Sequence, residues 1–168
     1  MKSTLLIVAD GARCRLIAAK SSEDEAFEPA VELVECDALA NPEALLQEQN
    51  IYSDAGGRNR SHAGGPAHGY DDHRQRHHEE MLRKFARDIV VHAENAMQSN
   101  QLVQLLLLAN SRLLGALREQ LPPRMHEKVV MTIEEDATKK NLDELRRLLQ
   151  KRGLIPERRV QPGYGARG

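Results

Sequence analysis

The residues best suited to chemistry lie between positions 53 and 80, in the segment SDAGGRNRSHAGGPAHGYDDHRQRHHEE. The segment holds five of the chain's seven histidines, four arginines and two Gly-Gly pairs. Arginine and titratable histidine suit phosphate contacts, and glycine lets a backbone approach a ligand closely. The pattern predicts contact with folded RNA through Arg58, Arg60, His68, Arg74 and Arg76. A disordered loop is the alternative, and aromatic residues, at 3% of the chain, are too few for a base-stacking surface.

A second chemistry, metal binding, is indicated by His73 and His77. Their i,i+4 spacing puts both side chains on one face of a helix, which suits a divalent metal. A third ligand would have to come from His62 or His68, because the sequence has no second spaced ligand pair and no HExxH motif. Exposed histidines on a solvated helix are the alternative. We therefore expect no metal and no cofactor, and keep a metal-assisted hydrolase as an alternative function.

Motifs for other kinds of catalysis are absent from the sequence. It contains no GxSxG nucleophile elbow and no GxxxxGK[ST] phosphate loop. Glu134, Glu135 and Asp136 follow an apolar run and could hold a cation at the carboxyl end of a parallel strand. A solvated acidic loop is the simpler interpretation, and the sequence favours a protein that is not an enzyme.

The elements that must position these residues are strands followed by alternating strands and helices. Asp10-Gly11 predicts a β-hairpin at the start of the chain, because Asp and Gly tolerate the positive φ of a two-residue turn. Apolar runs and helical periodicity predict strands near 4–9, 12–18, 31–36, 102–109 and 128–133, helices over 73–98, 112–120 and 141–152, and a short helix or turn at 42–49.

These elements predict a single α/β sandwich domain over residues 1–155, followed by a mobile basic tail at 156–168. The sheet is expected to be mixed and five-stranded, with the β-hairpin at its N-terminal end. A long glycine-rich loop, 53–72, leads into the long helix 73–98, and two further helices complete the fold.

The long helix is expected to project beyond the core at its start. Its first two turns, HRQRHHEE, have no apolar face, and a Glu79–Arg83 pair at i,i+4 would stabilise them. Capping-box spacing, which marks helix starts, occurs at Asp72–Gln75 and at Asn141–Glu144.

Composition limits the classes of function. The net charge of the 168-residue chain is -1, which is not the signature of a general nucleic-acid binder. From Lys151 onward, however, there are five basic residues and one acidic residue.

Cys14 and Cys36 fall in expected strands and should be reduced thiols. No segment approaches the roughly 18 apolar residues that span a bilayer, and the first apolar run is too short for a secretion signal. We therefore expect a cytoplasmic protein without membrane insertion.

Three segments resemble the bacterial host attachment protein family, whose members are named as required for attachment to host cells. They are LIVADGAR at 6–13, ANSRLLGALR at 109–118 and IEEDAT at 133–138. The third departs from the family's usual Asp-Lys-Asp-Leu-Thr form at Glu135 and Ala137. The resemblance implies a phenotype, attachment to host cells, and no mechanism.

The layout is also similar to the middle domain of archaeal and eukaryotic peptide release factors, where a hairpin and a strand precede a glycine loop and a long helix. There a Gly-Gly-Gln tip enters the ribosomal peptidyl-transferase centre, and Gly64-Gly65-Pro66 falls in the corresponding place. Pro66 has no backbone N–H to donate, so peptidyl-tRNA hydrolysis is not carried over. The resemblance implies association with idle or stalled ribosomes, and adds Gly64, Gly65 and Pro66 to the expected RNA-binding residues.

Taken together, these features predict a non-enzymatic ribosome- or RNA-associated factor of the hibernation or rescue type, which inserts its glycine-rich loop into an RNA cavity. An envelope or cell-surface factor that supports attachment to host cells is the first alternative, and the metal-assisted hydrolase is the second.

Overall fold

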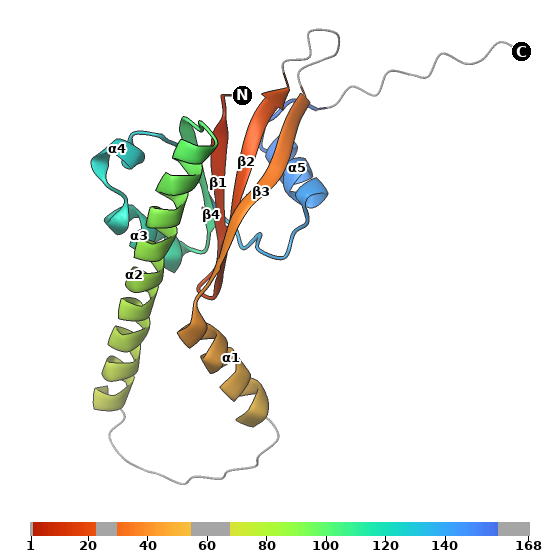
Figure 1. The fold of residues 1–168 in the computed structure, drawn as a ribbon. Coiled ribbons are helices and arrows are strands. Elements are labelled where there is room, and N and C mark those ends of the chain that lie inside the picture. Colours follow the sequence, from red (N-terminus) through yellow and green to blue (C-terminus); the bar gives the residue numbers. More distant parts are fainter. Residues whose placement is uncertain (1, 23–29, 55–67, 158–168) are drawn as a thin grey trace, which may run out of the picture.

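Five strands form one mixed sheet in the order β3-β2-β1-β4-β5. The computed structural model describes residues 2–22, 30–54 and 68–157. The strands are β1 (Thr4–Ala9), β2 (Arg13–Ser22), β3 (Ala30–Ala40), β4 (Gln104–Ala109) and β5 (Val129–Glu134), and the helices are α1 (Pro42–Asp54), α2 (His68–Ser99), α3 (Ser111–Gln120), α4 (Pro123–His126) and α5 (Leu142–Lys151) (Figure 1). The expected α/β fold with a five-stranded mixed sheet is confirmed.

The core lies on both faces of the two central strands. β1 is antiparallel to β2 and parallel to β4, and β4 is parallel to β5. Leu5 and Ile7 of β1 face α2, α3 and α4, whereas Leu6 and Val8 face α5. Because helices cover both faces, β1 and β4 consist of continuous apolar runs, as expected of buried parallel strands.

The helices around the glycine-rich segment are longer than the sequence predicts. α2 begins at His68, five residues before position 73, so Asp72 lies inside the helix and does not cap it. α1 continues to Asp54 instead of ending near position 49. Its first part, PEALLQEQ, is rich in strong helix formers. Residues 55–67 of the expected loop and 158–168 of the expected tail lie outside the described residues.

The β1–β2 hairpin is confirmed, but its turn is not the expected one. Neither Asp10 nor Gly11 has a positive φ. Instead, the Asp10 carboxylate Oδ1 accepts the backbone N–H groups of Ala12 and Arg13, each at 2.7 Å. The aspartate side chain therefore closes the turn in the way that Asx turns do.

Candidate functional site

Three separate segments of the chain meet at the carboxyl edge of the parallel strands. Asp10 follows β1, Asn110 follows β4, and residues 135–138 follow β5. β1 and β4 are paired in register as far as Ala9 and Ala109, so Asp10 and Asn110 emerge side by side. These are the segments that resemble the host attachment family, and this edge is where open α/β sheets bind ligands.

Asp10 and Thr138 link the hairpin to the loop that follows β5. The Thr138 hydroxyl lies 3.2 Å from Asp10 Oδ2 and 2.7 Å from Asp136 Oδ1. The backbone N–H of Thr138 also donates to Asp136 Oδ1, at 3.1 Å. A threonine hydroxyl has one hydrogen, so the two carboxylates share it, and the hydroxyl ties their loops together.

Arg15 and Asn41 extend this network to neighbouring elements. Arg15 Nη1 donates to the carbonyl oxygen of Thr138 at 3.1 Å, and Arg15 Nε donates to Glu35 Oε1 at 2.9 Å. Asn41, which is 5% exposed, donates its backbone N–H to the Ala12 carbonyl at 2.8 Å and its amide to the Gly11 carbonyl at 3.1 Å. We call this network the Asp10 hub and define it as Asp10, Arg15, Asn41, Asp136 and Thr138.

The Asp10 hub has a structural character. Its carboxylates, amide and guanidinium contact partners within the protein, and no buried side-chain nitrogen or oxygen among the described residues lacks a hydrogen bond. Burial raises the pKa of the nearby Cys14 thiol far above its usual range, which disfavours the thiolate form. The arrangement positions chain segments relative to one another.

The hub also holds the root of an arm made of α1 and α2. Asn41 directly precedes α1, and Ala12 packs with Ala44 of α1 and Met81 of α2. A Cβ placed on Gly11 would lie 3.4 Å from Leu82 Cδ2 of α2, so the hairpin tip sits directly against that helix. Beyond this contact both helices project from the sheet edge (Figure 1). Residues 71–80 of α2 are exposed, apart from a half-buried His78, as the polar pattern predicts.

The structure describes three of the eight expected RNA-binding residues. Arg74 and Arg76 are exposed on the projecting part of α2, and His68 is the first residue of that helix. The other expected residues lie outside the described ranges, and they are Arg58, Arg60, Gly64, Gly65 and Pro66.

Further basic residues lie along the same helix. Arg76, Arg83, Lys84 and Arg87 line an open hollow of about 540 Å³, together with Glu79 and Glu80. Arg83 pairs with Glu119 of α3 at 3.4 Å and not with Glu79, because the packing of α3 on α2 brings Glu119 within reach. The three arginines were missed in the sequence as a group, although their spacing of seven and four residues is that of one helix face.

The expected metal pair has one acidic neighbour. His73 and His77 are exposed on α2, and His77 Nε2 lies 3.9 Å from Glu43 Oε2 of α1. Among the described residues, no group of three or more His, Cys, Asp or Glu side chains is arranged to hold a metal ion. His62, the other proposed ligand, lies outside them.

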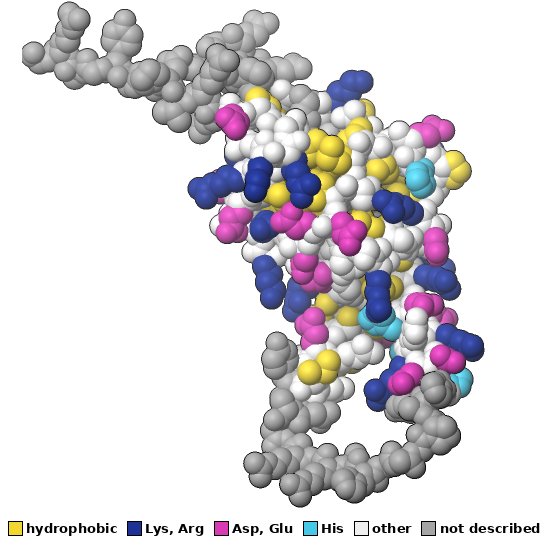
Figure 2. Space-filling view, turned by 180° about the vertical axis from the view of Figure 1, so that it is seen from behind, with side chains coloured by type: hydrophobic (Ala, Val, Ile, Leu, Met, Phe, Trp, Pro, Cys, Tyr) yellow, Lys and Arg dark blue, Asp and Glu magenta, His cyan; other side chains and the backbone are white. Residues whose placement is uncertain are grey.

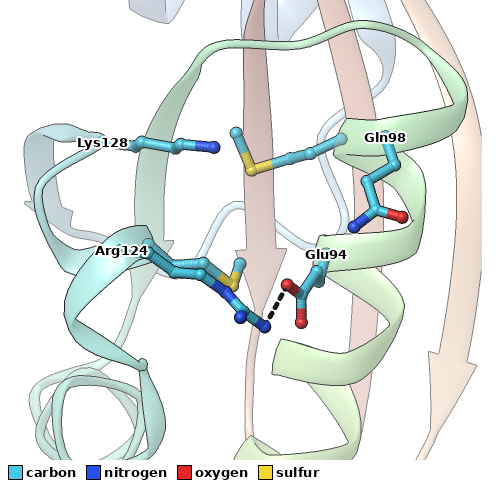
Figure 3. Close-up of a pocket in the computed structure, with 6 residues that line it drawn as sticks. Glu94, Gln98, Arg124 and Lys128 are labelled. Carbon is cyan, nitrogen blue, oxygen red and sulfur yellow. Dashed lines mark ion pairs between the residues drawn. The ribbon is translucent and has the colours of Figure 1, made fainter.

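An ion pair and a histidine contact link the rest of α2 to its neighbours. At its C-terminal half, Glu94 pairs with Arg124 of α4 beside a second hollow of about 220 Å³ (Figure 3). On its other side, His92 Nδ1 lies 2.7 Å from Asp37 Oδ2 of β3. This hydrogen bond lowers the pKa of Asp37 below its usual range. These contacts join α2 to β3 and to α4 where its buried apolar side chains cover the sheet.

The comparisons with known proteins identify a family. The model of the family described as "Protein required for attachment to host cells" matches residues 5–149, from β1 through most of α5. No curated protein matches the sequence. Within the described residues, no helix has the length and apolar character needed to cross a membrane. The matched region includes every residue of the Asp10 hub and the whole arm, and the chain therefore belongs to the family of proteins required for attachment to host cells.

Proposed function

We propose that this protein is a non-enzymatic factor that associates with the ribosome or other structured RNA through the α1–α2 arm, with residues 55–67 entering an RNA cavity. The observation that carries the proposal is the exposure of α2 over residues 71–80. A helix that extends well beyond the core gains little from packing there, and so it is available to a partner. The arm is also held at a defined orientation by the Asp10 hub, which reduces the ordering cost of binding.

The charges on α2 fit a nucleic-acid backbone better than a protein groove. Arg76, Arg83 and Arg87 follow one helix face, with Arg74 closer to the helix start. The distance from Arg76 to Arg87 along the helix axis is about 16 Å, at about 1.5 Å per residue. This length is sufficient for more than one backbone phosphate. Glu79 and Glu80 interrupt the face, so we expect moderate affinity and strong sensitivity to salt.

The direct test is co-sedimentation with ribosomes at low salt. Arg74→Glu combined with Arg76→Glu should remove the protein from the ribosomal pellet. The matched control is Arg147→Glu combined with Lys151→Glu on α5, which makes the same change in net charge on the opposite face. Figure 2 shows that face, where basic and acidic side chains are intermixed. All three proteins should remain folded with similar melting temperatures, because the four replaced side chains are exposed.

Two results would overturn the RNA proposal. One is an arm variant that sediments with ribosomes as the wild type does. The other is equal loss of the arm variant and the α5 variant, which would indicate general charge attraction with no role for the arm. If the arm binds phosphates, the arm variant should also depend less on salt. The slope of log affinity against log salt concentration should become shallower by about 0.7–0.9 for each arginine that contacts a phosphate.

The family description favours a second candidate function, in which the protein supports attachment to host cells at the envelope. Cell fractionation separates the two candidates. Intact protein found mainly on the cell surface or in the medium would favour attachment, and intact protein that sediments with ribosomes would favour the RNA proposal.

A further inference from the structure

The hollow between α2, α4 and the start of β5 combines an apolar lining with charged walls. Met97 and Met125 form the apolar base of the hollow and are largely buried, at 4% and 2% exposed. Figure 3 shows Glu94 and Gln98 on the α2 side, and Arg124 and Lys128 on the opposite side. Methionine side chains are flexible and polarisable, and they line sites that accept varied apolar groups.

The charges of this hollow favour an anion. Arg124 and Lys128 contribute two positive charges and Glu94 contributes one negative charge. Glu94 is already paired with Arg124, whereas Lys128 forms no ion pair with any part of the chain that the structure describes. The Lys128 ammonium is therefore the group that a ligand carboxylate would meet, with the Gln98 amide and the Arg124 guanidinium as further donors.

Backbone hydrogen bonds hold both walls of the hollow in place. The Lys128 N–H donates to the Met125 carbonyl at 3.0 Å, and the Lys128 carbonyl accepts from the Leu105 N–H of β4 at 2.8 Å. On the other wall, the Leu102 N–H donates to the Met97 carbonyl at 2.8 Å. A site with fixed walls loses little freedom on binding.

We propose that this hollow binds a carboxylate joined to a short apolar group, with the carboxylate on Lys128 and the apolar group on Met97 and Met125. Its volume of about 220 Å³ is below the roughly 300–1,000 Å³ of pockets for drug-sized ligands. It therefore suits a free apolar amino acid or short-chain acid, or the C-terminal residue of a peptide. Gln98 lies about 16 Å along α2 from Arg87, the nearest arginine of the proposed RNA surface, at about 1.5 Å per residue, and the two hollows share no lining residue.

The methionines provide a direct test in the full-length protein. With ¹³C-methyl-labelled methionine, titration of N-acetyl-leucine should shift the Met97 and Met125 methyl signals in a saturable manner. Met81, which packs with Ala12 and Ala44 at the root of the arm, and Met131, which is 37% exposed on β5, are internal controls and should not move. N-acetyl-leucinamide, which lacks the charge, should bind at least about tenfold more weakly.

A variant and two further ligands complete the test. Lys128→Gln keeps a side chain of similar shape and should weaken N-acetyl-leucine binding at least about tenfold, while Lys84→Gln on α2 should leave it unchanged. Tighter binding of free leucine than of N-acetyl-leucine would assign the site to a free amino acid, and tighter binding of a peptide ending in leucine would assign it to chain ends. The proposal is overturned if Met97 and Met125 do not shift, if Met131 shifts equally, if the amide binds as well as the acid, or if Lys128→Gln binds like the wild type.

Discussion

Replacement of Asp10 by alanine should destabilise the fold more than its position in a surface turn implies. Asp10→Ala removes the acceptor for two backbone N–H groups and for the Thr138 hydroxyl. It also disconnects the hairpin tip from the loop that follows β5. The substitution introduces no clash, because a methyl group replaces a larger side chain, so its effect measures the hydrogen bonds of the Asp10 hub.

The size of the effect follows from the exposure of the three donors. A hydrogen bond to a charged acceptor contributes roughly 1.5–3 kcal/mol, and less where water can take its place. The Ala12 N–H is partly buried, the Arg13 N–H is exposed, and the Thr138 contact is long at 3.2 Å. Only the hydrogen bond from the Ala12 N–H therefore contributes its full free energy, and the other two contribute less. We expect a loss of about 3 kcal/mol, which for a chain of this size lowers the melting temperature by roughly 6–12 °C.

Thermal and urea denaturation of three variants checks this value. Asp10→Asn keeps one oxygen acceptor and should lose less than half as much stability as Asp10→Ala. Asp88→Ala, at an exposed position on α2, is the matched control and should change stability by less than about 0.5 kcal/mol. If Asp10→Ala melts within about 2 °C of Asp88→Ala, the hub does not hold the carboxyl edge together.

Three further predictions concern the surroundings of the hub. Asn41→Ala leaves the Gly11 carbonyl without its side-chain donor and should cost about 1–2 kcal/mol in urea denaturation; an unchanged midpoint would contradict this. A thiol reagent should label half-buried Cys36 before buried Cys14 in the native protein, because burial raises the pKa of the Cys14 thiol. Both cysteines should be labelled in denaturant. Faster labelling of Cys14 in the native protein, measured by mass spectrometry, would refute this prediction. The hydrogen bond with His92 lowers the pKa of Asp37 below its ordinary value of 3.8. The contact therefore gives its full stabilisation at pH values above 3.8, and this stabilisation is lost as the pH falls through the lowered pKa of Asp37. Both side chains are more than one third exposed, so Asp37→Asn should cost less than about 1 kcal/mol at neutral pH, and the difference in melting temperature from the wild type should vanish in acid.

Sequence patterns predict the parts of this fold in which local signals agree with tertiary packing. The apolar runs of β1 and β4 can be buried only in the middle of a covered sheet, and both strands lie there. Asn141 and Glu144 form the expected capping box at the start of α5. In each case the residues that carry the signal contact one another, or contact the core directly, so a short window of sequence contains the necessary information.

The remaining features depend on partners that are distant in the chain. Thr138 reaches Asp10 across 128 positions, and neither residue carries a local sign of the contact. Asp10-Gly11 is compatible both with a two-residue turn and with a turn closed by the aspartate side chain. In the structure the Asp10 carboxylate closes the turn and also contacts Thr138 in the loop after β5. Arg83 likewise pairs with Glu119 across a helix interface, although Glu79 has suitable spacing in the sequence.

The position of the hub relative to the arm makes stability and binding separable. The hairpin tip next to Asp10 holds the root of the arm through Gly11, Ala12 and Asn41. The exposed Arg74 and Arg76 lie further out on α2. Arg76→Glu should therefore change binding without changing stability. Asp10→Asn should lower stability and also weaken binding under conditions in which the protein is still folded, because the root of the arm loses part of its support. If Asp10→Asn lowered the melting temperature but left ribosome co-sedimentation unchanged, the hub would stabilise the sheet alone, and the orientation of the arm would have to be set by the packing of Ala12, Ala44 and Met81.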